Sequence, residues 1–370
     1  VCMGLLLVLS SCHTGKQITA SGLQRKDFQT EVNGQHTDLF TLSNKQGMEV
    51  CITNYGARVV SILVPDRNGK REDVVCGFST ITEYMEQRQN FGSTVGRYIG
   101  RILNARFTLD GVEYKLVPNN GKSGHISHGG NPGFADRIWK VEQADTHRVC
   151  LSYLSPDGEN GFPGNLKVTL AYSLGEDDNA LDLTYEATTD APTVLNLSHH
   201  SFFNISGNFT KSVEDQQLWV DADRFTPYDD KKCVTGEYLP VAGTPLDFRM
   251  PHTIGECIDA DHPQLKVVNG YDHTWELNTK GDDTRPAAWV YDPASGRKME
   301  IFTTEPGMQI YTGNGLKGKM TGKGGIAYPF RSAVCFETMH FQDSPNQPGF
   351  PSTVLRPGEV FRSHTVYKFE

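Results

Sequence analysis

Apolar and polar residues alternate along most of the chain, and a period of two is typical of strands that bury one face. The alternation is found at 50–54, 60–64, 107–116, 168–174, 181–187, 289–291, 298–302, 333–338 and 360–366. Between residues 107 and 116, the pair Asp110-Gly111 predicts a hairpin, because Asp-Gly favours the two-residue type I′ turn.

Helical periodicity is limited to 80–88 and 251–257, and each stretch predicts one short helix. No repeat of fixed period and no linker divides the rest of the chain. We therefore predict an all-β fold, a large antiparallel β-sandwich with few short helices, in a single domain over residues 28–370.

The composition is that of an ordinary globular protein, because 37% of the 370 residues are hydrophobic and 21% are charged. The 37 glycines and 19 prolines suit many short strands joined by turns. The net charge is −9 and no basic run is present, which argues against a nucleic-acid partner. Nothing in the sequence indicates an obligate protein partner, so a monomer is expected.

The first residues have the pattern of a targeting segment. Residues 4–9 form an apolar run too short to span a bilayer, and the small residues before Cys12 resemble a bacterial lipobox. We expect residues 1–11 to be a signal peptide, Cys12 to carry a lipid anchor and residues 12–27 to be a tether. The protein would then lie in the bacterial cell envelope, facing the periplasm, without a transmembrane span. The alternative is a mispredicted start or a buried strand, with a cytoplasmic protein.

The eight cysteines indicate neither a metal site nor a dense disulfide framework. Cys2 and Cys12 belong to the N-terminal segment, and the other six are scattered singly without a C-x-x-C pair. The D-x-[DN]-x-[DN]-G calcium loop is missing from the sequence, and so are the nucleotide-binding and nucleophile-elbow motifs. The sequence therefore predicts no metal site and gives no support to phosphoryl transfer or cofactor-borne redox chemistry.

Two clusters contain candidate acid–base groups. Glu337 lies in the apolar run 333–338, where a carboxylate is costly unless it is paired or functional, so it is the best candidate for a base. His199 and His200 are adjacent on a predicted strand and point to opposite faces, so only one can face a given pocket. Phe202 could pack beside a sugar ring. Taken alone, this cluster is explained better by a histidine hydrogen-bonded at a sheet surface.

Four further clusters contain groups that bind hydroxyls or carboxylates. Arg97 and Arg101 lie four apart in a glycine-bearing apolar stretch, where each is either a ligand-binding group or part of a structural ion pair. His128 lies in a glycine-rich loop that lets backbone approach a ligand closely. Asp272 could accept hydrogen bonds from two hydroxyls, or could cap a turn. Gln309 ends a Thr-Glu-Pro-Gly-Met-Gln stretch.

Taken together and in this order, the clusters resemble the aldose 1-epimerase (galactose mutarotase) family. The resemblance covers about residues 28–370 and rests on motifs at 96–102, 127–130, 196–205, 270–273, 304–309 and 337–346. It implies a β-supersandwich with His200 and Glu337 as the catalytic pair, although His199 and Gly100 stand where asparagine is usual. The substrate-binding residues that it implies are Gly100, Arg101, His128, Ser201, Phe202, Asp272 and Gln309.

The resemblance also implies the reaction, which interconverts the α and β anomers of free aldohexoses such as glucose and galactose in hexose metabolism. Glu337 would take the anomeric hydroxyl proton, and His200 would protonate the ring oxygen. The resemblance implies that no cofactor is required for this reaction, and it leaves calcium as a possible ligand, because some members of the family bind it.

Three alternatives are weighed against this interpretation. A glycosidase would need two carboxyl groups facing one bond, and Asp272 and Glu337 could in principle serve. A non-catalytic sugar-binding sandwich would be expected to lack the acid or the base, yet His200 and Glu337 are both present. A hexose-6-phosphate epimerase would need additional cationic residues for the phosphate, and no such cluster is visible in the sequence.

Overall fold

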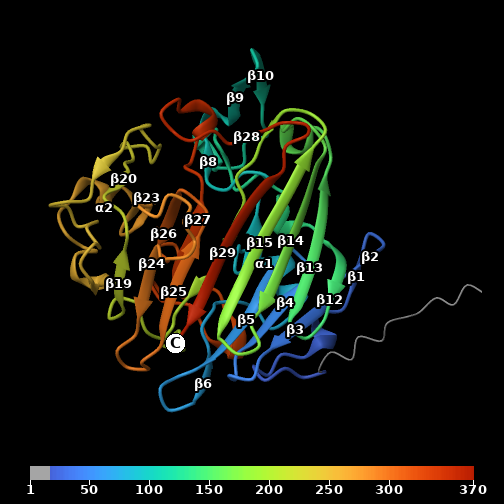
Figure 1. The fold of residues 1–370 in the computed structure, drawn as a ribbon, viewed down its shortest axis with the longest axis vertical. Helices are drawn as coiled ribbons and strands as arrows, with labels where there is room; N and C mark the ends of the chain where they lie inside the picture. The colour runs from blue at the N-terminus through green and yellow to red at the C-terminus, as the bar shows by residue number, and fades with distance from the viewer. Residues whose placement is uncertain (1–16) are drawn as a thin grey trace, which may run out of the picture.

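The computed structural model describes residues 17–370, so the expected signal peptide and Cys12 lie outside the described residues. Strands dominate the fold, and three antiparallel sheets contain most of them (Figure 1). The predicted all-β class is therefore confirmed.

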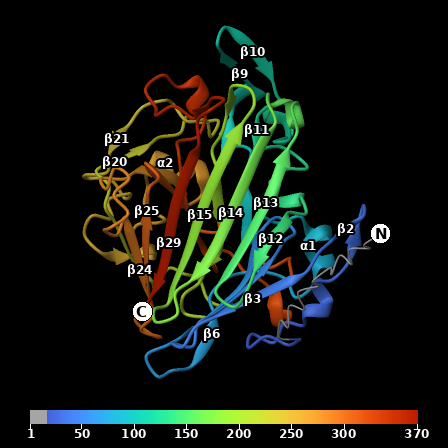
Figure 2. The same cartoon turned by 45° about the vertical axis from the view of Figure 1, so that its right-hand side comes forward.

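The largest sheet has nine strands. In spatial order they are β12 (Lys140–Ala144), β13 (Arg148–Ser155), β14 (Leu166–Leu174), β15 (Ala180–Thr189), β29 (Phe361–Phe369), β25 (Lys298–Thr303), β24 (Ala288–Tyr291), β19 (Gln217–Val220) and β22 (His252–Thr253). The long strands β13, β14, β15 and β29 lie side by side in both views (Figures 1 and 2). Strands β14 and β15 pair from Leu166–Thr189 to Leu174–Leu181, so two of the alternating segments lie next to each other in this sheet.

Two smaller sheets complete the sandwich. The six-stranded sheet has the order β18 (Phe202–Phe203), β27 (Val334–Met339), β26 (Gly307–Tyr311), β23 (Asp272–Glu276), β20 (Arg224–Thr226), β21 (Leu239–Pro240). The four-stranded sheet has the order β3 (Leu39–Ser43), β4 (Glu49–Thr53), β5 (Arg58–Pro65), β6 (Arg71–Asp73). The two-stranded pairs are β1 (Glu31–Val32) with β2 (Gln35–His36), β7 (Ser93–Val95) with β17 (Ser198–His200), β8 (Arg101–Ile102) with β11 (Ile126–Ser127), β9 (Arg106–Leu109) with β10 (Val112–Lys115), and β16 (Thr193–Val194) with β28 (Val354–Leu355).

The main hydrophobic core joins the three large sheets. Leu170 and Leu183 from the nine-stranded sheet, Trp275 and Phe336 from the six-stranded sheet and Ile52 from the four-stranded sheet are buried in one cluster. Side chains on a strand point alternately to its two faces, so the neighbours of Phe336 on β27 face away from this core. That opposite face of the six-stranded sheet is where polar groups can gather.

Local sequence signals account for the hairpin and for the first helix. Asp110 and Gly111 have φ angles of 51° and 80°, both positive as a type I′ turn requires, and the predicted hairpin is β9–β10. The helix predicted at 80–88 is α1 (Ile81–Gln87), and it begins with a capping box between Thr80 and Glu83. Both predictions are confirmed.

The helix predicted at 251–257 is wrong. The segment forms strand β22 and the 3₁₀ turn η6 (Ile254–Glu256). The N–H groups of Ile254 and Gly255 bond to the carbonyls of Gln216 and Glu214, so the backbone pairs with residues next to β19 rather than with itself. Tertiary pairing therefore overrides the local pattern.

The second α-helix is α2 (Pro263–Val268), which was not predicted. Pro263 stands in its first turn and Asn269 ends it in the left-handed conformation, with φ 62°. Proline at the start and asparagine at the end are recognised helix signals, so the sequence did contain the information.

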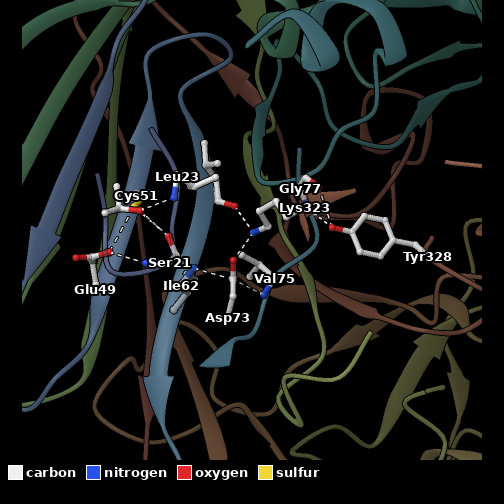
Figure 3. Close-up of polar contacts among 12 residues, drawn as sticks. Ser21, Leu23, Glu49, Cys51, Ile62, Asp73, Val75, Gly77, Lys323 and Tyr328 are labelled. Atoms are coloured by element: carbon white, nitrogen blue, oxygen red, sulfur yellow. Dashed lines mark hydrogen bonds and ion pairs between the residues drawn. The ribbon is translucent and has the colours of Figure 1, made fainter. Parts of the chain in front are cut away.

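The described part of the expected tether, residues 17–27, packs against the domain. Leu23 is buried, and the backbone N–H of Ser21 donates a hydrogen bond to Glu49 on β4 (Figure 3). The backbone N–H of Ala20 donates to the same carboxylate. The 3₁₀ turn η1 (Arg25–Phe28) follows and buries Phe28. The folded part of the chain thus begins before residue 28.

The loop that contains Lys323 and Tyr328 contacts the four-stranded sheet and the segment that follows it. Lys323 forms an ion pair with Asp73 on β6, and the Tyr328 hydroxyl donates to the Gly77 carbonyl (Figure 3). Within residues 17–370, none of the helices has the length and apolar character needed to cross a membrane. The six cysteines of these residues form no disulfide with one another.

Candidate active site

A pocket of about 250 Å³ opens on the polar face of the six-stranded sheet. It is lined by Gln89, Asn90, Gly100, Arg101, Ser127, His128, His200, Phe202, Asp272, Gln309, Tyr311, Glu337, Met339 and Gln342. All of the site residues predicted from the sequence are in this set except Ser201. Segments far apart in the chain thus contribute to one concave site, the arrangement expected for a small-molecule ligand.

His200 and Glu337 meet in this pocket. The Nε2 atom of His200 lies 3.3 Å from Oε1 of Glu337, and the two residues are 6% and 4% exposed. His200 ends β17, while Glu337 lies in the middle of β27 and points away from the main core. A histidine and a carboxylate in contact within a pocket form a general acid–base pair in geometry.

Burial changes the proton affinity of both partners. It lowers the pKa of His200 well below 6.5, and the neighbouring His128 adds to the effect. It raises the pKa of Glu337 well above 4.5, and the negative charge of Asp272 raises it further. Both shifts favour the uncharged form of each group, and perturbed pairs of this kind are typical of catalytic sites.

The structure separates the two adjacent histidines. His199 points to the other side of the strand, where its Nε2 lies 2.6 Å from the Ser201 hydroxyl and its Nδ1 lies 3.5 Å from the Tyr172 hydroxyl. Burial lowers the pKa of His199 to about 3, so this ring is neutral at physiological pH. His200, not His199, therefore faces the pocket.

A row of paired residues carries polar groups across the sheet beside Glu337. Gln309 on β26 stands opposite Glu337 on one side and Thr274 on the other. Its amide Nε2 donates to Asp272 Oδ1 at 2.7 Å, and its Oε1 accepts from the Thr274 hydroxyl. Burial raises the pKa of Asp272, while the charge of Arg101 opposes that shift. Asp272 and Gln309 therefore present oriented acceptor and donor groups to the pocket.

Arg101 begins β8, and His128 directly follows β11, the strand that pairs with β8. The guanidinium of Arg101 makes no hydrogen bond or ion pair with any residue of the described chain 17–370, so its donors are free for a ligand in the pocket that it lines. His128 has a φ of 52°, and its Nδ1 accepts from the Gly100 N–H at 3.5 Å. Burial lowers the pKa of His128 to about 4, with a contribution from the charge of Arg101. At neutral pH the ring is uncharged, so its Nε2 carries the proton and can donate.

Phe202 and Ser201 lie in different surroundings. The Phe202 ring stacks on His200 with a centroid distance of 5.1 Å and an interplanar angle of 17°, and it lines the pocket. Ser201 is buried behind the strand, where its hydroxyl contacts His199. Alternation along this segment places neighbouring residues on opposite sides, so the structure does not bring Ser201 to the site.

Sequence reasoning missed Gln342, which lies just beyond β27. Its amide donates to the Tyr228 hydroxyl at 2.7 Å and to Gln309 Oε1 at 3.3 Å. It lies over Gly100, where an added Cβ would approach Gln342 Cγ to 2.5 Å. Gln342 stands inside the motif at 337–346, but at a variable position of that motif, so no sequence signal distinguished it.

The pocket wall at Gln89 and Asn90 was also missed. These residues follow α1, and the buried guanidinium of Arg58 donates to the carbonyls of Gln89 and Phe91. Arg58 also donates to the carbonyl of Ala135 in the facing loop. The buried Arg58 side chain therefore holds together two segments at the rim of the site, the one after α1 and the one that contains Ala135.

The sequence profile of the aldose 1-epimerase family matches residues 38–368. The chain belongs to the aldose 1-epimerase family. Among its family relatives, the galactose mutarotase of Sus scrofa is 39% identical over 330 residues, which cover 89% of this chain and 93% of that protein. The aldose 1-epimerase of Escherichia coli K12 is 36% identical over 339 residues, which cover 91% and 96%.

Solved structures of the aldose 1-epimerase family share the fold. An aldose epimerase homologue from C. elegans superposes with a TM-score of 0.83 at 31% identity, covering 90% of this chain and 99% of that one. A galactose 1-epimerase from Lactobacillus acidophilus gives 0.80 at 28% identity, covering 92% and 96%. The predicted supersandwich and the predicted family are therefore both confirmed.

Proposed function

We propose that this protein is an aldose 1-epimerase that interconverts the α and β anomers of free aldohexoses such as galactose and glucose, with Glu337 and His200 as its acid–base pair. The observation that supports these roles is the 3.3 Å contact between His200 Nε2 and Glu337 Oε1 in a pocket with oriented hydroxyl-binding groups. Mutarotases and aldose 1-epimerases among its relatives give the class of reaction.

Mutarotation opens the hemiacetal ring and closes it on the other face of the carbonyl. Glu337 removes the proton of the anomeric hydroxyl while His200 gives a proton to the ring oxygen, so the bond from C1 to that oxygen breaks. Rotation about C1–C2 turns the aldehyde, and ring closure then runs the two transfers in reverse. Only protons pass between the sugar and the protein, and breaking and re-forming the bond from C1 to the ring oxygen causes no net oxidation, so the chemistry requires no redox group. The family is generally independent of cofactors.

The pair works as a unit that holds one transferable proton. Burial favours carboxylic acid on Glu337 and neutral imidazole on His200 in the pocket without sugar. A second state of the pair, with a carboxylate on Glu337 and an imidazolium on His200, holds the same number of protons. The 3.3 Å contact lets the proton pass from Glu337 to His200 and so converts the first state into the second. Ring opening then starts from the carboxylate–imidazolium form.

The surrounding groups hold the sugar while its anomeric carbon turns. Asp272 accepts hydrogen bonds from hydroxyls, and Arg101 and His128 donate to sugar oxygens from the opposite wall. Gln309 keeps Asp272 oriented through its 2.7 Å hydrogen bond. The Phe202 ring supplies an apolar surface for a sugar C–H face.

Polarimetry on freshly dissolved α-D-galactose and α-D-glucose tests the function. We expect the purified chain to accelerate the drift of optical rotation above the spontaneous rate, and the ratio of the two accelerations gives the preferred sugar. A glycoside such as methyl galactoside has no free anomeric hydroxyl, so no reducing sugar is released from it. An unchanged drift for every free aldose tested contradicts the proposal.

We also propose that the protein is a monomeric lipoprotein of the bacterial cell envelope, anchored through Cys12. The support is the apolar run at 4–9 followed by small residues and a cysteine. Mass spectrometry of the mature N-terminus after expression in a bacterium tests the anchor, and a Cys12→Ser variant is the control. A mature chain that keeps residues 1–11, or that carries an unmodified Cys12, contradicts it. Light scattering of the detergent-free soluble body tests the monomer.

A further inference from the structure

A third potential ligand atom lies beside the catalytic pair. Cys335 is two residues before Glu337 on β27, so both side chains point to the same face of the strand. A nitrogen of His200, the Cys335 sulfur and a carboxylate oxygen of Glu337 all lie within 4.8 Å of one another. All three residues are buried, and Cys335 pairs in register with Phe202 and Tyr311, both of which line the pocket.

The donor set and its spacing suit a zinc ion. Imidazole, thiolate and carboxylate are the ligand types that zinc binds, and three protein ligands with one open position is a recurring zinc arrangement. Two ligands bound about 2.0–2.1 Å from a tetrahedral metal lie roughly 3.3–3.4 Å apart. The measured distance from His200 Nε2 to Glu337 Oε1 is 3.3 Å, so these two atoms already span one edge of such a site.

Negative charge acts on two of the three ligand groups, because Asp272 influences both Cys335 and Glu337, while the cation Arg58 acts on His200. Among residues 17–370, no lysine or arginine forms an ion pair with Glu337. His200 and Glu337 line the pocket, which gives an ion a route from solvent to the buried thiol. On binding, the Cys335 thiol releases its proton to solvent and coordinates as thiolate.

We propose that His200, Cys335 and Glu337 form a binding site for Zn²⁺ and that the bound ion inhibits the enzyme. The metal occupies His200 Nε2 and the Glu337 carboxylate, which are the atoms that exchange protons with the sugar. The fourth position faces the pocket and takes water or a sugar hydroxyl. Only the inhibition rests on the proposed function, because metal binding is measured without substrate.

Binding is tested on the full chain freed of metal. Co²⁺ serves as a spectroscopic stand-in for Zn²⁺, because cobalt bound to a thiolate absorbs in the near ultraviolet. We expect one Co²⁺ per chain with this absorption, and its displacement by one equivalent of Zn²⁺. Cys335→Ser should lose the band and weaken zinc binding by at least about tenfold, since even indirect partners of a metal are worth 10–100-fold. Cys51→Ser, at a cysteine equally buried on β4, should keep both.

Inhibition is measured by polarimetry on the same proteins. Zn²⁺ should slow mutarotation by the wild type and by Cys51→Ser, and a chelator should restore the rate. Cys335→Ser should turn over at the wild-type rate and resist zinc, because the thiol takes no part in the proposed proton transfers. If Cys335→Ser fails to fold, Glu337→Gln is titrated with Co²⁺ and Zn²⁺ instead, and the same tenfold loss is expected.

The outcomes are distinct. The proposal is overturned if the wild type shows no thiolate–cobalt band, or if the band persists in Cys335→Ser. It is also overturned if Glu337→Gln binds zinc with unchanged affinity, or if zinc inhibits Cys335→Ser and the wild type equally. A wild type that gives the band but shows no mutarotation with any aldose retains the metal site and refutes the proposed function.

Discussion

The Nε2 atom of His200 lies 3.3 Å from Oε1 of Glu337, and the two side chains reach each other from strands that belong to different sheets. This contact is the basis of the proposed proton transfers. We expect His200→Asn and Glu337→Gln each to lower kcat by roughly 10²–10⁴-fold, the usual contribution of a positioned acid or base. Polarimetry on freshly dissolved sugar measures the rate, and circular dichroism checks the fold. Turnover close to wild type in either folded variant would exclude the assigned role.

His199 should behave differently from its neighbour. His199→Asn leaves the pocket unchanged, since His199 faces away from it, and kcat should stay within a few-fold of wild type. The hydrogen bond between His199 Nε2 and the Ser201 hydroxyl is lost, which should lower the free energy of unfolding by about 1–3 kcal/mol. Urea denaturation measures this loss. A large fall in kcat without loss of stability would mean that His199 acts in catalysis.

The acid limb of the pH profile should respond to Asp272. Burial and the charge of Asp272 raise the pKa of Glu337 well above 4.5, so activity should fall with decreasing pH while still above the ordinary carboxyl range. Asp272→Asn removes a negative charge that disfavours ionisation, so the limb of kcat/KM should move to lower pH. The control is Asp261→Asn, which changes an exposed carboxylate outside the pocket. A limb that stays in place in Asp272→Asn contradicts the coupling.

Gly100 tests the role of Gln342. Gly100→Ala would place a Cβ 2.5 Å from Gln342 Cγ at a φ of 74°, so Gln342 must move and its hydrogen bond to Tyr228 is disturbed. We expect KM to rise several-fold. Gly111→Ala is the matched control, because its φ is 80° but nothing lies within 4 Å of the added atom. It should lose stability through backbone strain alone and keep its KM. Equal KM values in the two variants would show that Gln342 does not shape the sugar site.

His364 on β29 should make stability depend on pH. Its hydrogen bond with Asp182, helped by Asp283, raises its pKa from 6.5 to about 9 despite partial burial. A raised pKa in the folded state means that the stabilisation is fully present below pH 6.5 and is lost as the pH rises towards 9. The free energy of unfolding should therefore decrease over this window. His364→Gln should remove that component of the slope, as chemical denaturation at several pH values would measure. An identical slope in the variant would contradict the assignment.

Local sequence information determined the individual strands and the hairpin. Residues 168–174 and 181–187 alternate because one face of each strand is buried, and Asp110-Gly111 fits a turn with two positive φ angles. Such signals depend on residues close together in the chain, so they can be recognised without knowing which strand each segment pairs with. The helix expected at 251–257 failed for the converse reason, because its backbone groups found partners next to β19.

The motifs of the family, in their order along the chain, also determined most of the candidate pocket, including Arg101, His128, Asp272 and Gln309. The sequence alone could nominate Glu337 on physical grounds, as a carboxylate within an apolar strand. Residue chemistry alone did not separate His199 from His200, and the family motif assigned the catalytic role to His200. The position of β17 between the pocket and the core gives the physical reason, because it directs His200 into the pocket and turns His199 and Ser201 away from it. Gln342 lines the pocket and Cys335 lies beside the catalytic pair only because β27 and the segment after it bring them there. The periodicity of a strand shows that it has two different faces, but only its packing against other strands determines whether a given face contacts the core or the pocket.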